Sequence, residues 1–160
     1  MKKIILFALV AVSLLQAEIK KEYFSNGKLK IEASYRDGQR DGIYKEYYRN
    51  GTLKSEFSYR NGIEDGMQKE YARNNILLYE KNMYNGKRDG MSKEYYDDGS
   101  LYSEITYRDG LKDGVAKYYS RDRRLLKEIR YRDDKVISGY RYHNGRRVQI
   151  RTRYDEDRQE

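Results

Sequence analysis

The chain has 160 residues, carries 34 Lys and Arg against 26 Asp and Glu, and has a formal net charge of +8. It contains no Cys, which excludes a disulfide framework, a thiolate nucleophile and a cysteine-based zinc site. Tyr is the main large side chain, with 19 copies beside three Phe and no Trp, and this composition suits a β-sheet whose faces are only half buried.

Residues 1–17 have the layout of a signal peptide. Lys2 and Lys3 precede an apolar run that starts at Ile4, and Ala17 supplies the small residue before cleavage. The apolar run is shorter than the roughly 20 residues of a membrane-spanning helix, and charged residues follow it directly. We expect cleavage near Ala17 and export of the mature chain to the periplasm or to the outside of the cell.

The net charge of the mature chain is confined to its C-terminal end. Without Lys2 and Lys3, 32 basic residues stand against 26 acidic ones, which gives +6. Residues 18–116 hold 18 basic and 18 acidic residues, whereas residues 117–160 hold 14 and 8. Only the last part of the chain is therefore biased towards an acidic partner.

A 24-residue repeat organises the chain from Lys21 onwards. Within a repeat domain of residues 18–154, the units at 21–44, 45–68, 69–92, 93–116 and 117–140 align without a gap until the last. Tyr, Leu and Glu recur in fixed columns, and the Tyr column comprises Tyr23, Tyr47, Tyr71, Tyr95 and Tyr119. Residues 141–154 are expected to form a partial cap, and residues 155–160 a polar tail.

Each unit contains two alternating runs around a turn pair such as Asn50-Gly51, which predicts a two-residue type I′ hairpin. The register centred on this turn pairs Tyr48 with Leu53, Tyr44 with Phe57, Tyr47 with Lys54 and Lys45 with Glu56. The Lys-Glu pair recurs in every unit, and its value lies more in specifying register than in stability.

A second connection follows each hairpin and ends at Gly42, Gly66, Gly90 and Gly114. Its paired glycines suit a turn that needs positive φ twice. In the fifth unit Asp134 and Ser138 replace these glycines, Gly139 comes one position late, and Asp122-Arg123 replaces the hairpin turn, so this hairpin should be the loosest. The fold class that follows is all-β: an elongated single-layer antiparallel sheet of tandem hairpins, with ten strands spanning about 50 Å.

The string of Tyr, two residues, Gly, three residues, Gly resembles the repeat of the membrane occupation and recognition nexus (MORN) family. It occurs from Tyr35 to Gly42, from Tyr59 to Gly66 and from Tyr107 to Gly114, while the third unit has Met83 at the Tyr position. The KEYYxNGxLKSE stretch is similar to the bacterial MORN variant, a group associated with antitoxin or immunity-type roles. The resemblance covers roughly residues 21–139 and implies an open single-layer β-sheet that engages proteins and, in some members, lipids.

Two groups of residues are candidates for binding. The Tyr column at Tyr47, Tyr71, Tyr95 and Tyr119 would place rings about 10 Å apart, where they could receive peptide side chains or sugar rings. The alternative is that these rings shield a sheet that has no second layer. The basic end could contact phosphate groups, or could instead discourage edge-to-edge aggregation, and it comprises Arg141, Arg146, Arg147, Arg151 and Arg153.

Residues suited to catalysis are scarce. His143 is the only histidine and lies beside the Asn144-Gly145 turn, where we expect a solvated side chain and not a general base. Each Glu of the repeated column already has an opposed Lys, so it offers no free carboxylate pair. We expect no enzymatic activity, no cofactor and no metal site.

The function that these features favour is an exported, non-catalytic surface for binding or scaffolding a protein partner, including an antitoxin-type role. The alternative is an envelope-associated protein that binds anionic lipid or glycan through its basic end and its tyrosines. Nucleic acid as a partner conflicts with the export signal.

Overall fold

The computed structural model describes residues 17–152. The expected signal peptide lies outside these residues except for Ala17, as do Arg153 and the expected polar tail. Every strand of the described part joins one 13-stranded sheet, in which paired strands are antiparallel. The predicted all-β class and the single antiparallel sheet are confirmed. Within residues 17–152, no helix has the length and apolar character needed to cross a membrane.

The strands follow one another along the chain with short turns between them. They are β1 (Ala17–Tyr23), β2 (Leu29–Arg36), β3 (Gln39–Tyr47), β4 (Leu53–Arg60), β5 (Ile63–Tyr71), β6 (Leu77–Tyr84), β7 (Lys87–Arg88), β8 (Gly90–Tyr95), β9 (Leu101–Arg108), β10 (Leu111–Tyr119), β11 (Leu125–Arg132), β12 (Lys135–His143) and β13 (Arg146–Gln149).

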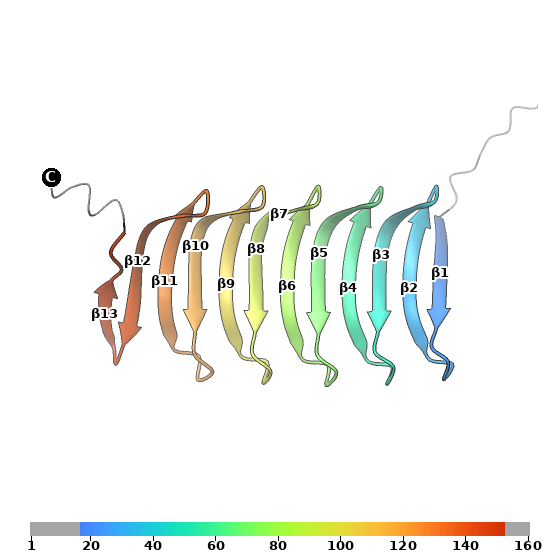
Figure 1. Ribbon diagram of the computed structural model, residues 1–160, viewed down its shortest axis with the longest axis horizontal. Coiled ribbons are helices and arrows are strands. Elements are labelled where there is room, and N and C mark those ends of the chain that lie inside the picture. The colour runs from blue at the N-terminus through green and yellow to red at the C-terminus, as the bar shows by residue number, and fades with distance from the viewer. Residues whose placement is uncertain (1–16, 153–160) are drawn as a thin grey trace, which may run out of the picture.

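Each strand pairs with its neighbours in sequence, and β7 and β8 are two pieces that both pair with β6. The strands stand side by side in one row with β1 and β13 at opposite ends (Figure 1). The long axis of the molecule therefore runs across the strands, and each hairpin contacts chiefly its neighbours in the sequence.

The turn inside each hairpin differs from the predicted type I′. Gly51 N donates to Tyr48 O, and Tyr48 N donates to Thr52 O, both at 2.8 Å. Gly51 has φ of 96°, whereas Asn50 is not among the residues with positive φ. This geometry is a three-residue loop, a type I turn followed by a left-handed residue that forms a bulge.

The bulge changes the register next to the turn. Tyr47 pairs with Leu53, so the predicted pairs Tyr48–Leu53 and Tyr47–Lys54 are wrong. The three-residue loop causes this displacement, and the predicted register returns at Glu46 and Ser55 because Lys54 is an extra residue in β4. Further from the turn the predicted pairs of Tyr44 with Phe57 and of Lys45 with Glu56 are confirmed.

The type I′ turn lies instead at the other end of the strands. Asp37 and Gly38 have φ of 51° and 77°, and Arg36 pairs with Gln39 on either side of them. The second glycine of this connection, Gly42, lies in a bulge of β3, with φ of 104°. A Cβ added there would come within 3.1 Å of Ser34 Cβ. The two glycines therefore have different roles: Gly38 forms the turn, and Gly42 allows the backbone to lie close to Ser34.

Hydrogen bonds between turns join neighbouring hairpins. Gly62 N donates to Arg40 O at 2.7 Å, and Asn61 N donates to Asp41 Oδ2 at 3.3 Å. Asp41 also forms an ion pair with Arg36 of its own unit at 3.6 Å. Asp41 thus links the turn of one hairpin to the turn of the next, and Asp65 makes the equivalent contacts with Asn85 and Arg60.

The fifth unit keeps the common turn geometry despite its altered residues. Arg123 N donates to Ser120 O at 2.8 Å, as the equivalent glycines do in other units. Gly139 is not a displaced bulge glycine: it pairs with Ile129, and a Cβ added to it would meet Glu128 O and Ile150 Cδ1, both at 3.1 Å. A small residue is needed there because Ile150 packs over it.

Alternation along the strands gives the sheet two different faces. The packed face carries every buried residue of the described strands, namely Ala33, Ser55, Gln68, Ser92, Ser103, Ile105, Tyr107, Ala116, Ile129 and Gly139. Ile105, Tyr107 and Ala116 form its hydrophobic cluster, against which Tyr118 and Tyr131 pack. The opposite face carries the repeated Lys and Glu columns that contain Lys45 and Glu56, and we call it the ladder face.

Candidate functional site

A continuous row of alternating charges, the Lys–Glu ladder, crosses the ladder face. Each inner member lies opposite a residue of the other charge on both sides, as Lys45 lies opposite both Glu32 and Glu56. The sequence predicted the pairs within hairpins, and the structure adds the pairs between hairpins. The ladder comprises Lys21, Glu32, Lys45, Glu56, Lys69, Glu80, Lys93, Glu104, Lys117 and Glu128.

Ion pairs in the ladder form both within and between units. Within hairpins, Lys21 Nζ lies 2.9 Å from Glu32 and Lys45 Nζ lies 3.2 Å from Glu56. Between hairpins, Lys93 is 3.2 Å from Glu80 and Lys117 is 3.8 Å from Glu104. The hydrogen bond to Glu56 raises the pKa of Lys45 above its ordinary value. The ladder therefore favours one register from β1 to β11 while adding no net charge.

The predicted Tyr column lies beside the ladder, on the same face. Tyr47, Tyr71, Tyr95 and Tyr119 end β3, β5, β8 and β10, and each pairs with a Leu that begins the next strand, so that together they form a Tyr–Leu row. The Tyr95 hydroxyl donates to Glu80 Oε1 at 3.0 Å, and the Tyr119 hydroxyl donates to Glu104 Oε1 at 2.8 Å. Burial is the larger cause and these hydrogen bonds are the second, and together they raise the pKa of both tyrosines to about 12.

A hollow lies between two successive tyrosines of the row. It has a volume of about 360 Å³ and lies between Tyr95 and Tyr119, with Leu101, Gly99, Ser100 and Arg123 completing its lining. Both hydroxyls are engaged by the ladder, so the tyrosines offer ring surface to this hollow. The rings of Tyr95 and Tyr119 thus border a notch, and stacking on the Tyr column stays a prediction.

A second apolar row on the ladder face was missed by sequence reasoning. Ile19, Ile43, Met67 and Met91 are 63%, 41%, 38% and 46% exposed, and we call them the Ile–Met row. Ile43, Met67 and Met91 each follow directly after a bulge glycine. All four residues are spaced 24 positions apart, so the alignment of the repeats contained this apolar column. Exposed aliphatic side chains in register across several strands are typical of an interaction surface.

The predicted basic end is not a single patch. Arg141 of β12 pairs with Val148, and Arg147 of β13 pairs with Tyr142, so alternation puts the two arginines on opposite faces. The Arg147 guanidinium lies 4.3 Å from the centre of the Tyr140 ring. Arg146 and Arg151 are exposed as well, whereas Arg153 lies outside the described residues. The arginines that the structure describes are therefore divided between the two faces of the sheet, and their role in binding stays a prediction.

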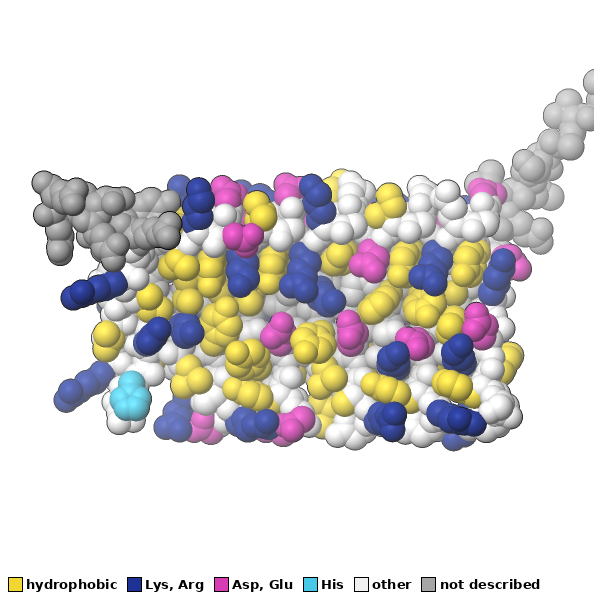
Figure 2. All heavy atoms as spheres, viewed as in Figure 1, with side chains coloured by type: hydrophobic (Ala, Val, Ile, Leu, Met, Phe, Trp, Pro, Cys, Tyr) yellow, Lys and Arg dark blue, Asp and Glu magenta, His cyan; other side chains and the backbone are white. Residues whose placement is uncertain are grey.

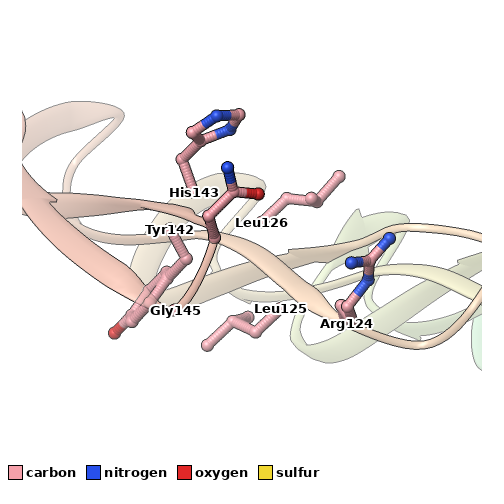
Figure 3. A pocket seen from close by; sticks show the side chains of 7 residues that line it. Arg124, Leu125, Leu126, Tyr142, His143 and Gly145 are labelled. Carbon is pink, nitrogen blue, oxygen red and sulfur yellow. The ribbon is translucent and has the colours of Figure 1, made fainter.

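His143 lines a hollow of about 420 Å³ between the start of β11 and the β12–β13 turn. In Figure 3, His143 and Leu126 point to one side of the ribbon, and Tyr142 and Leu125 point to the other. The side chains thus diverge, and no carboxylate is among the described residues that line the hollow. Nor does any group of three or more His, Asp or Glu in residues 17–152 have an arrangement that could hold a metal ion.

Comparison with protein families connects the hairpin to a known repeat. A family model matches residues 19–37, 40–61 and 88–109. The matched repeat is the MORN repeat variant. The matches cover the β1–β2, β3–β4 and β8–β9 hairpins, so the matched repeat corresponds to the hairpin closed by the three-residue loop. MORN repeats are in general modules that bind proteins or lipids. A search of curated proteins found no match to this chain.

Proposed function

We propose that the protein is a non-catalytic binding module that engages a protein partner through its ladder face. The observation that carries the proposal is the distribution of exposed apolar side chains. Of the twelve large hydrophobic residues exposed in the described part, eight lie on the ladder face: Ile19, Tyr23, Ile43, Ile63, Met67, Tyr84, Met91 and Leu111. Methionine in particular adapts its shape to a partner surface.

The packed face supports the proposal by contrast. Its aromatic side chains pack against one another, as Tyr44 does on Phe57 with ring centres 6.3 Å apart. Tyr102 similarly contacts both Tyr96 and Tyr118 edge-on. One broad face of the sheet is shown in Figure 2, where hydrophobic, basic and acidic side chains form rows along the long axis. The aromatic side chains of the packed face thus contact one another, whereas the side chains of the Ile–Met row are exposed and available to a partner.

The location and the biological role of the module are part of the same proposal. Residues 1–17 would act as a signal peptide and place the module in the periplasm or outside the cell. An antitoxin role has no support in the MORN match or in the surface geometry, and it stays a prediction. Inspection of the neighbouring gene for a toxin, with co-expression of the two proteins, tests it directly.

A second candidate is a contact with anionic lipid or glycan through the basic end. The exposure of Arg141, Arg146, Arg147 and Arg151 favours it. The division of these arginines between two faces limits how many can meet one flat surface at once. This candidate predicts binding that weakens sharply as ionic strength rises.

The deciding experiment compares matched variants of the two faces. Replacing Met67 and Met91 by Thr keeps strand propensity and removes the apolar tips, whereas Tyr79→Thr with Val148→Thr makes the equivalent change on the packed face. We expect the first pair to reduce partner capture in a pull-down by at least tenfold, and the second pair to leave it unchanged. Equal capture by both pairs would contradict the proposal.

The lipid candidate needs its own arm of the same experiment. Replacement of Arg146, Arg147, Arg151 and Arg153 by Gln should weaken co-sedimentation with anionic vesicles if that candidate is right. The hypothesis that the partner stacks on the Tyr column predicts instead that Tyr47→Ala, Tyr71→Ala and Tyr95→Ala reduce partner capture. If the Arg set changes neither vesicle binding nor partner capture, the lipid candidate is rejected.

A further inference from the structure

Arg123 occupies a backbone position that arginine does not favour. It has φ of 61°, in the left-handed region. The equivalent turn position is filled by Gly27, Gly51 and Gly99 in three other units and by Asn75 in the third. Glycine accepts this conformation without steric cost, and asparagine tolerates it better than residues with longer side chains. Arg123 thus occupies a position whose backbone conformation favours glycine, and it lies at the rim of the hollow between Tyr95 and Tyr119.

The charges around this turn leave Arg123 uncompensated. Arg121 forms ion pairs with Asp97 and Asp98, and Arg124 forms one with Asp122. Arg123 is exposed and has no ion pair with any acidic residue in the described part of the chain. Its guanidinium is therefore free to pair with a group from outside the chain.

The remaining lining fixes the chemistry that would fit beside this guanidinium. The hydroxyls of Tyr95 and Tyr119 are engaged with the ladder, and Ser100 Oγ donates to Asp98 Oδ1 at 2.5 Å. The hollow therefore offers two rings, the side chain of Leu101 and one cation. A group with a short aliphatic stem and a terminal carboxylate complements all of these, because guanidinium and carboxylate match in charge and in planar geometry.

We propose that the hollow between Tyr95 and Tyr119 is a pocket for an acidic side chain of the protein partner. Arg123 pairs with the carboxylate, while the rings and Leu101 contact its aliphatic stem. This inference rests on the proposed function, because it assigns one anchor point on the ladder face. It also gives the partner a stated chemistry, an extended segment that carries glutamate or aspartate.

The test uses Arg123→Gly, a variant that removes the cation and relieves the backbone. We expect the thermal unfolding midpoint to rise by roughly 3 °C, so that lost binding cannot be ascribed to misfolding. The probe is a synthetic peptide of alternating Glu and Val residues, titrated into the isotope-labelled protein and followed by NMR. Shifts at Tyr95, Tyr119 and Leu101 are expected, with affinity about tenfold lower in the variant.

Two controls accompany the variant. Arg124→Gln removes a charge from the same turn but not from the hollow, and it should retain most of the affinity. A peptide with Gln in place of Glu should not shift the hollow resonances. Unchanged affinity in Arg123→Gly, or equal binding of the Gln peptide, would overturn the proposal. Polygalacturonate that binds the hollow more tightly than the peptide would also overturn it, since the pocket would then belong to an acidic glycan.

Failure of this inference can be distinguished from failure of the proposed function. If the Met67 and Met91 variants lose the partner while Arg123→Gly retains the Glu peptide, only the pocket assignment fails. If those ladder variants retain the partner and Arg123→Gly loses the peptide, the pocket stands and the ladder-face proposal fails.

Discussion

Tyr119 donates its phenolic hydrogen to Glu104 of the preceding hairpin, with 2.8 Å between the two oxygens. Glu104 also pairs with Lys117 at 3.8 Å, so one carboxylate joins the Tyr–Leu row to the Lys–Glu ladder. Tyr95 and Glu80 repeat this arrangement one unit earlier, at 3.0 Å. At these two units the Tyr–Leu row and the Lys–Glu ladder are therefore connected across hairpin boundaries.

This network predicts a loss of stability at high pH. The folded state raises the pKa of Tyr95 and Tyr119 to about 12, above the value of about 10 in the unfolded chain. Their contribution is complete below about pH 10 and is lost as the pH rises towards 12, because only the unfolded state releases these protons there. Urea unfolding at about pH 8 and about pH 11 should show this loss. The double variant Tyr95→Phe with Tyr119→Phe should lose less between the two pH values, and an equal loss would contradict the assignment.

Charge reversal within the ladder should destabilise the sheet. Glu56 lies between Lys45 and Lys69, so Glu56→Lys places three like charges side by side. We expect the free energy of unfolding to fall by about 1 kcal/mol at low salt and by less at high salt. Glu94→Lys makes the same change opposite Tyr79 and Ser103, and it serves as the control. A cost that does not depend on salt would argue against an electrostatic origin.

The link between turns can be tested at Asp41. Asp41→Ala removes the acceptor for Asn61 N and the ion pair with Arg36, and we expect a loss of about 1 to 2 kcal/mol in unfolding free energy. Hydrogen exchange at the Asn61 amide should accelerate. Asp41→Asn retains an acceptor oxygen and should recover part of the loss. Slow exchange at Asn61 in the Ala variant would show that Asp41 does not support the turn.

The packed face contains polar groups whose removal should stabilise the fold. Ser103 is 1% exposed, and its Oγ has no hydrogen-bond partner in the described residues. Ser103→Ala should therefore raise the unfolding free energy by about 1 kcal/mol. Ser58→Ala is a matched control with the opposite expected sign, because Ser58 Oγ donates to Met67 O at 3.1 Å. Thermal unfolding of both variants decides the point, and destabilisation by Ser103→Ala would reveal a partner such as bound water.

The register could be predicted because the Lys and Glu columns are complementary at one spacing only. The type I′ turn was predicted at the wrong end of the strands. An Asn-Gly pair fits both a type I′ turn and the end of a three-residue loop. The two differ in the φ of the residue before glycine, as Asn61 at 49° differs from Asn50, and strand pairing decides that angle. The sequence located the basic residues at the C-terminal end, but their division between two faces at Arg141 and Arg147 depends on the strand pairing.

The candidate surface was predicted in part. The Tyr column was found because aromatic residues stand out in the alignment, and the structure places these residues on one face. The Ile–Met row escaped notice because one aliphatic residue per unit, such as Ile43 or Met67, has the composition of an ordinary core position. Only the single-layer architecture, which leaves that face uncovered, makes these side chains available to a partner.

The ladder has the same charge order in every unit, so moving along it by one hairpin restores the same surface. Two strands at about 4.8 Å each give a translation of about 10 Å. A whole unit of 24 residues could be removed or duplicated without bringing like charges together. A single inserted residue within a strand would instead exchange the faces of every residue that follows it in that strand. A partner that contacts two equivalent positions of the ladder must therefore have its own contact points separated by a multiple of about 10 Å.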